Sequence, residues 1–79
     1  MPCYFFNVRT SAGLVIDEIG HDLSDIAAVR VESERGARSI LSDDIRFGRA
    51  LSLDQFEVTD DSGAVVFVYH FLDVVKLHV

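Results

Sequence analysis

Four short segments of the chain, bounded by turn-forming or polar residues and rich in apolar side chains, are predicted to be β-strands. They are residues 3–9, 14–16, 55–59 and 64–71. Turn-forming residues separate the first pair at positions 10–13 and the second pair at positions 60–63. Each pair therefore predicts a β-hairpin.

Between the hairpins the hydrophobic period becomes that of an α-helix, over about residues 24–47. Asp22 or Ser24 is expected to cap its first turn, and Gly48 to take the left-handed conformation that ends it. Gly36 inside the helix predicts either a close approach to the sheet or a bend. One stripe of the helix collects Ile26, Val29, Ser33, Ala37, Ile40, Asp44 and Phe47.

The order of these elements, β, β, α, β, β, predicts an α+β fold in which one long helix packs on one face of a small antiparallel sheet. Residues 1–79 are expected to form a single domain, because the chain is too short for two independent cores. The tail, residues 72–79, alternates only weakly. It is consistent with a short strand, an arm that reaches a partner, or a loose end.

The strand predicted over residues 64–71 is apolar on both faces, since Val66 and Val68 alternate with Phe67 and Tyr69. A single helix covers only one face of a sheet, so something else must cover the other. We expect a second copy of the chain to do so, in a homodimer whose contact includes Phe5, Val66 and Val68. The alternative is that residues 72–79 fold back over this face.

Composition narrows the range of partners. The chain has 79 residues, of which 13 are acidic and 7 are Lys or Arg, and its net charge of −6 disfavours binding to nucleic acids and anionic lipid surfaces. Cys3 is the single cysteine, which excludes an internal disulfide and fits the cytoplasm. No apolar run approaches the roughly 18 residues that span a bilayer, and the N-terminus lacks the pattern of a signal peptide.

The basic residues are concentrated in the predicted helix, because five of the seven lie between Arg30 and Arg49. Arg35, Arg38 and Arg46 fall on the face opposite the apolar stripe, where they form a row suited to phosphate or carboxylate groups. The alternative is a solvated face on which arginines pair locally with acids three or four residues away.

An acidic segment before the helix offers the strongest candidate for metal binding. It contains four carboxylates and one imidazole, on Asp17, Glu18, His21, Asp22 and Asp25. The alternative is that acids at this position simply complement the helix dipole. No phosphate-binding loop, nucleophile motif or paired ligand motif occurs, so no catalytic residue and no cofactor is predicted.

The chain resembles an uncharacterised family of small bacterial proteins that open with Met-Pro-x-Tyr-Phe-Phe, a domain of unknown function. The residues that carry the resemblance are Met1, Pro2, Tyr4, Phe5, Phe6, Asp17, Glu18, Gly20, Leu23, Ala27, Ala28, Asp60, Gly63 and Phe71. Position 7, often histidine or aspartate in such proteins, is Asn7 here. The resemblance implies a bacterial intracellular origin and a common fold, and it adds no catalytic residue.

Three functions remain open at this point. The first is a noncatalytic dimeric module that presents its arginine-bearing helix to an unidentified protein partner. The second is a small regulator that binds nucleic acid or an anionic ligand through Arg35, Arg38 and Arg46, with affinity that falls steeply with salt. The third is a metal-dependent enzyme that uses residues 17–25, which predicts bound metal in the purified protein.

Overall fold

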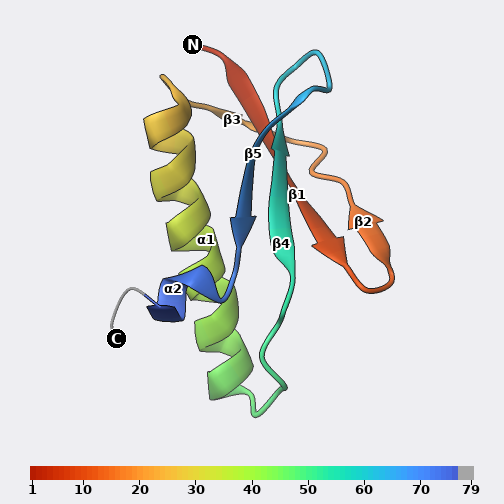
Figure 1. The fold of residues 1–79 in the computed structure, drawn as a ribbon, viewed down its shortest axis with the longest axis vertical. Coiled ribbons are helices and arrows are strands. Elements are labelled where there is room, and N and C mark those ends of the chain that lie inside the picture. Colours follow the sequence, from red (N-terminus) through yellow and green to blue (C-terminus); the bar gives the residue numbers. More distant parts are fainter. Residues whose placement is uncertain (77–79) are drawn as a thin grey trace.

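The computed structural model describes residues 1–76 of the chain. In chain order its elements are β1 (Cys3–Thr10), β2 (Gly13–Val15), β3 (His21–Asp22), α1 (Ile26–Arg46), β4 (Gln55–Thr59), β5 (Val65–His70) and α2 (Asp73–Lys76). All strand pairs are antiparallel, and the sheet has the order β2-β1-β4-β5, with β3 pairing with β1 off this path (Figure 1). The α+β fold with one long helix is confirmed.

The predicted order ββαββ is incomplete, because two short elements were missed. The first is β3, which pairs His21 with Tyr4, and a strand of two residues is too short to display a period of two. The second is α2, which occupies part of the segment where a strand, an arm or a loose end was expected. It places Val74 in the hydrophobic core on the helix side of the sheet. The remaining tail residues, 77–79, lie outside the described part of the chain.

The two ends of α1 are set by local hydrogen bonds. The Asp25 carboxylate, rather than that of Asp22 or the hydroxyl of Ser24, accepts a bond from the Ala28 N–H at 2.9 Å, so the helix begins at Ile26. At the other end Gly48 has a φ of +68°, a left-handed conformation that favours glycine. The predicted stop at Gly48 is confirmed.

The centre of the predicted stripe on α1 faces the sheet. The buried residues of the helix are Val29, Ser33, Ala37, Leu41 and Asp44. The Ser33 hydroxyl is satisfied within the helix, because it donates to the Val29 carbonyl at 2.8 Å. Ile26 and Phe47, at the two ends of the predicted stripe, lie outside the hydrophobic core. They are 42% and 62% exposed, and α1 extends beyond the strands at the Phe47 end (Figure 1).

Gly36 marks a close approach between α1 and β4. A Cβ at this position would lie 3.0 Å from Cζ of Phe56. The Phe56 ring is itself fixed by edge-on contacts with Phe6 and Phe71, at centroid distances of 5.8 and 4.8 Å. Of the two explanations for Gly36, close approach is therefore the one that the structure supports.

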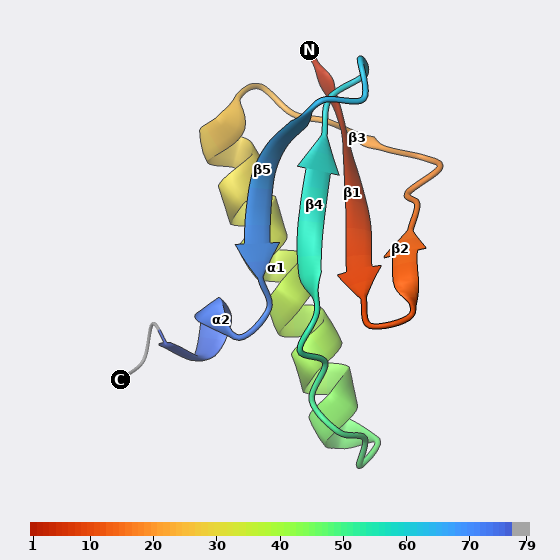
Figure 2. The same cartoon turned by 45° about the vertical axis from the view of Figure 1, so that its right-hand side comes forward.

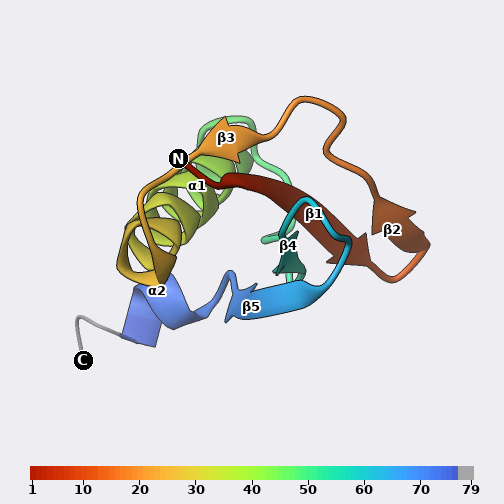
Figure 3. The same cartoon turned by 90° about the horizontal axis from the view of Figure 1, so that it is seen from above.

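The helices cover only one face of the sheet. Seen from above, α1 lies on one side of the strands, and within residues 1–76 no helix lies on the other (Figure 3). The register places Phe6 beside Val58 on the helix side, whereas Asn7 beside Glu57 belongs to the opposite side, which we call the open face.

The single chain leaves one side of the 64–71 strand exposed, and its coverage by a second copy stays a prediction. β5 is an edge strand, and its residues Val65, Val66 and Val68 are 57%, 36% and 43% exposed. The physical reason is that side-chain alternation fixes the two faces of a strand but carries no information on its position in the sheet.

Candidate functional site

The outer edge of β5 is the first candidate site. In Figure 2 the strands run β5, β4, β1, β2 from left to right, and turns of α1 lie behind and to the left of β5. Within residues 1–76 no strand pairs with the outer edge of β5. The Phe71 N–H donates to the Asp54 carbonyl at 3.1 Å, which fixes the alternation of the β4–β5 ladder. Tyr69 and Phe67 accordingly direct their backbone groups toward β4, while Val68 and His70 direct theirs outward.

The composition of β5 leaves this edge unprotected. Natural sheet edges are usually blocked by charged side chains, proline, β-bulges or very short strands, and in β5 only the bulge at its start is present. The strand Val65–His70 has six residues and contains no Asp, Glu, Lys, Arg or Pro. The opposite edge is formed by β2, which has only three residues. A β-bulge marks the start of β5, because Val58 pairs with Phe67 whereas Thr59 pairs with Val65.

The residues predicted to form an interface do not make one continuous patch. Val66 and Val68 lie together on β5, but Phe5 lies on β1, on the far side of β4. Phe5 is half-buried, and a Cβ on Gly20 would lie 2.9 Å from its Cε1 atom, so the loop before β3 packs against this ring. The exposed part of the predicted interface is therefore the β5 edge.

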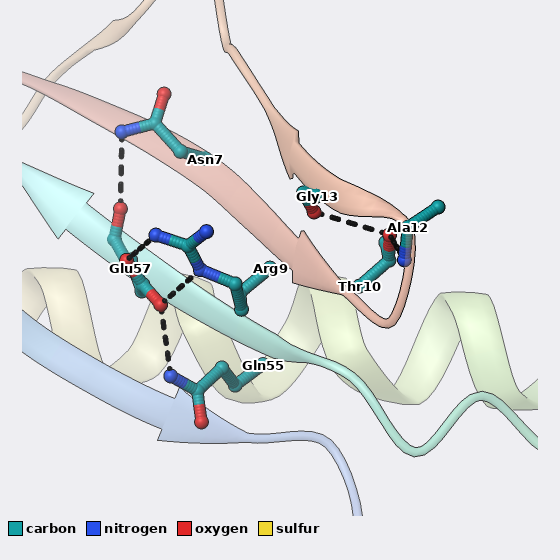
Figure 4. A network of polar contacts seen from close by, with 7 residues as sticks. All are labelled: Asn7, Arg9, Thr10, Ala12, Gly13, Gln55 and Glu57. Atoms are coloured by element: carbon teal, nitrogen blue, oxygen red, sulfur yellow. Dashed lines mark hydrogen bonds and ion pairs between the residues drawn. The ribbon is translucent and has the colours of Figure 1, made fainter.

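The open face has a polar centre. Arg9 on β1 and Glu57 on β4 form a two-point ion pair, with Nε 2.9 Å from Oε2 and Nη2 3.2 Å from Oε1 (Figure 4). Gln55 donates to the same Oε2 at 3.0 Å. The two charge-assisted bonds from Arg9 lower the pKa of the Glu57 carboxyl. In turn, the Glu57 carboxylate raises the pKa of Arg9. This network replaces the continuous apolar surface that the sequence analysis expected here.

Asn7 is the buried polar residue of the open face, with 4% of its surface exposed. Its amide nitrogen donates to the Glu57 carbonyl at 3.1 Å and to the Thr59 hydroxyl at 3.3 Å. Its amide oxygen accepts from the Asp17 N–H at 2.9 Å. Asn7 thus ties β1 both to β4 and to the loop that follows β2.

Asp17 holds that loop in place. Its carboxylate accepts backbone N–H bonds from Phe6 at 3.0 Å, Ile19 at 3.0 Å and Gly20 at 3.2 Å. Burial by itself raises the pKa of Asp17, but these bonds and the nearby His21 outweigh burial, so the pKa lies below its ordinary value. The carboxylate therefore serves as an acceptor within the protein.

A shallow depression of about 560 Å³ occupies the open face between β2 and the β4–β5 hairpin. Leu14 and Ile16 on one side and Val65 on the other supply exposed apolar surface, at 38%, 59% and 57%. The charged residues of the lining are Arg9, Asp17, Glu57, Asp60 and Asp61. Four carboxylates against one guanidinium give this lining a net charge of −3.

The three arginines predicted to bind anions lie on α1 but do not form a cluster. Arg35 pairs with Glu32 at 3.8 Å, as the local-pairing alternative expected. Arg38 lines a groove between the two helices, and the Arg46 guanidinium lies 5.9 Å from the centroid of the Phe47 ring. Eleven residues separate Arg35 from Arg46, which corresponds to about 16 Å along a helix.

The acidic segment 17–25 is dispersed by the fold. Asp17 binds backbone N–H groups, Asp25 caps α1, and the His21 ring packs edge-on against Phe6 at a centroid distance of 5.2 Å. Among residues 1–76 no group of three or more His, Cys, Asp or Glu side chains lies close enough together to hold a metal ion.

Two polar networks were missed by the sequence analysis. The Arg9–Glu57 pair depends on the β1–β4 register, which no local pattern encodes. Asp44, counted only as part of the helix stripe, accepts from the Ser52 N–H at 2.9 Å, from its hydroxyl at 2.8 Å and from Arg49 Nε at 3.3 Å. These bonds lower the pKa of Asp44 and tie the end of α1 to the segment before β4. The sequence did contain one signal for this network, because Asp44 is an acidic residue on the otherwise apolar stripe of the helix.

Comparison with known proteins gives a family and no activity. A family model described as a domain of unknown function, DUF6894, matches residues 3–72. No curated protein and no solved structure matches the chain. Within residues 1–76, neither helix has the length and apolar character needed to cross a membrane.

Proposed function

Since the chain belongs to the DUF6894 family, for which no function is known, we propose a function from its own surface: a noncatalytic protein-interaction module that forms a homodimer through β5. In this dimer β5 pairs antiparallel with β5 of a second copy, and the two sheets become continuous. The observation that carries the proposal is the unprotected edge of β5, with its outward backbone groups at Val68 and His70.

Backbone hydrogen bonding supports the edge as the contact. Unpaired N–H and C=O groups on a long, uncharged edge are a template for a further strand. The exposed side chains of Val65, Val66 and Val68 would add apolar burial to these bonds. Antiparallel pairing of identical strands has two-fold symmetry, the commonest symmetry of soluble oligomers.

Charge favours the β5 edge over the open face as the dimer contact. The lining of the open-face depression has a net charge of −3, so two copies meeting there would bring like charges together. The strand β5 contains no Asp, Glu, Lys or Arg, so its pairing does not bring carboxylates together. The earlier expectation of a face-to-face dimer is therefore replaced by an edge-to-edge dimer.

The second candidate function, anion binding through α1, has less support. Arg35 is engaged with Glu32, and Arg30 is engaged with Glu34 at 3.8 Å, so local pairs neutralise part of the basic face.

The proposed module belongs in the bacterial cytoplasm. The single cysteine, the free and half-buried Cys3, is consistent with a reducing compartment.

The oligomeric state in solution tests the proposal. Light scattering coupled to gel filtration is expected to give 17.6 kDa, twice the 8.8 kDa of the chain, at micromolar concentration. Val68→Lys places a charge on the edge and is expected to give a monomer with an unchanged circular dichroism spectrum. Val31→Lys is the matched control, because Val31 is 61% exposed on α1 and lies outside β5, so this variant is expected to remain dimeric.

Two results would contradict the proposal. One is a wild-type chain that stays monomeric up to high micromolar concentration. The other is a dimer that Val68→Lys and Val31→Lys affect equally, because this would place the contact away from β5.

A further inference from the structure

The depression on the open face has properties that the dimer does not use. It lies between β2 and the β4–β5 hairpin, whereas the proposed dimer contact is the outer edge of β5. Its lining combines exposed apolar side chains, those of Leu14, Ile16 and Val65, with carboxylates along the rim. A surface of this composition offers both apolar burial and charge attraction to one ligand.

Hydrogen bonds lower the pKa of three carboxylates in the lining of the depression. Asp60 accepts from the hydroxyl and the N–H of Ser62, and these bonds lower its pKa. The pKa of Asp17 and that of Glu57 are also lowered. Arg9 is occupied by Glu57, so the charge offered to a ligand comes from Asp17, Asp60 and Asp61.

Most basic residues of the chain lie away from the depression, whose lining contains Arg9 as its one basic residue. Five of the seven Lys and Arg residues lie between Arg30 and Arg49, on α1 or just after it, and α1 packs on the opposite face of the sheet. The two faces of the molecule therefore differ in charge. A ligand of the open face must therefore carry positive charge to complement its carboxylates.

We propose that the open-face depression binds a basic segment of a protein partner, in which lysine or arginine side chains alternate with apolar ones. The cationic side chains meet Asp17, Asp60 and Asp61 along the rim, and the apolar side chains cover Leu14, Ile16 and Val65. This inference rests on the proposed function, because it assigns the partner chemistry of the interaction module. It does not require the dimer, since Val65 is the one residue of the depression that belongs to β5.

The same charge argument excludes other occupants. Nucleic acids and anionic lipids carry negative charge and are repelled by a lining with a net charge of −3. A second copy bound by its own open face is repelled for the same reason. A basic protein segment has the charge and the apolar content that the lining complements.

The test uses a short fluorescein-labelled peptide that alternates lysine and leucine, with a peptide that alternates glutamate and leucine as its counterpart. Fluorescence anisotropy is expected to show binding of the lysine peptide alone, and binding should weaken as salt is raised. Amide chemical shifts in an NMR titration should change at Leu14, Ile16 and Val65 and stay constant along α1.

Asp61→Lys is the variant that tests the rim, because Asp61 is an exposed residue of the hairpin turn. It removes one attraction and adds one repulsion, so the affinity for the lysine peptide is expected to fall about three- to tenfold at low salt. Asp43→Lys makes the same charge change at an exposed position of α1 and should leave the affinity within twofold of wild type, roughly the limit of long-range effects.

Equal affinity for the two peptides, equal effects of Asp61→Lys and Asp43→Lys, or shift changes confined to α1 would each overturn the inference. Repeating the titration with Val68→Lys separates it from the dimer. If monomeric Val68→Lys still binds the lysine peptide, the open-face site does not depend on the dimer. If the wild-type dimer does not bind the peptide, the open-face inference is wrong and the proposed dimer is unaffected.

Discussion

The Arg9 guanidinium and the Glu57 carboxylate face each other across β1 and β4 and share two hydrogen bonds, of 2.9 and 3.2 Å. The pair lies at the centre of the open face, where the sequence predicts an apolar surface (Figure 4). Polar pairing at this point allows the open face to contact water without a large apolar patch.

Glu57→Gln is expected to lower the melting temperature at low salt, because it removes the ion pair while keeping the shape of the side chain. The loss should shrink as salt is raised, since the pair is partly exposed and screened. Thermal unfolding at low and high salt measures both effects. The swap Arg9→Glu with Glu57→Arg is the control, and it should recover part of the stability lost by either reversal alone.

Gly36→Ala is expected to destabilise the fold by about 1 kcal/mol. Alanine gains about 1 kcal/mol of helix propensity, but its Cβ would lie 3.0 Å from the Phe56 ring, and overpacking a fixed core side chain costs about 1–3 kcal/mol. Urea unfolding gives the difference. Ser39→Ala, at an exposed position of α1, should stay within about 0.5 kcal/mol of wild type. A clear gain in stability for Gly36→Ala would show that Phe56 moves freely.

Asn7→Ala is expected to lower the free energy of unfolding by about 1–3 kcal/mol, because it leaves the Glu57 carbonyl and the Asp17 N–H without their partner. Asn7→Asp keeps the shape but replaces the two N–H donors by an acceptor that faces the Glu57 carbonyl. It should therefore cost more at pH 7 than at pH 4, where the new carboxyl is protonated. Denaturant unfolding at the two pH values is the measurement, and equal losses at both would be inconsistent with these contacts.

The stability of the fold should fall on acidification. The folded-state pKa of Asp17 lies below its ordinary value, so the folded protein binds fewer protons than the unfolded chain as the pH falls. Its contribution is fully present above an unfolded pKa of about 4 and is lost as the pH drops through the folded pKa. Asp17→Asn should weaken this dependence in unfolding curves measured between neutral and acidic pH. Asp61→Asn, at an exposed turn position, should leave the dependence as in wild type.

Local periodicity was sufficient for the elements that are long or regularly patterned. The strand Gln55–Thr59 was predicted with its observed bounds, and the stripe through Val29, Ser33 and Ala37 does face the sheet. The helix start was displaced by two residues, because Ser24 and Asp25 are both good capping residues and only the backbone geometry selects Asp25.

The position of β5 at the edge could not be predicted, because the order β2-β1-β4-β5 depends on which strands meet after chain folding. The same limit hid the Arg9–Glu57 pair, which requires the β1–β4 register. The apolar alternation of one strand therefore left its place in the sheet open, and a face with a polar centre was expected to be apolar. Val66 and Val68 are 36% and 43% exposed, and their place in an interface stays a prediction.

Amide hydrogen exchange at Val68 and His70, followed by NMR as a function of protein concentration, tests the central claim most directly. These two residues direct their N–H groups away from β4, so in a single chain they exchange rapidly with solvent. Pairing of β5 with a second β5 predicts slow exchange at both positions at high concentration and fast exchange on dilution or in Val68→Lys. Fast exchange at His70 at every concentration, in a protein whose Tyr69 amide is protected, would contradict the account.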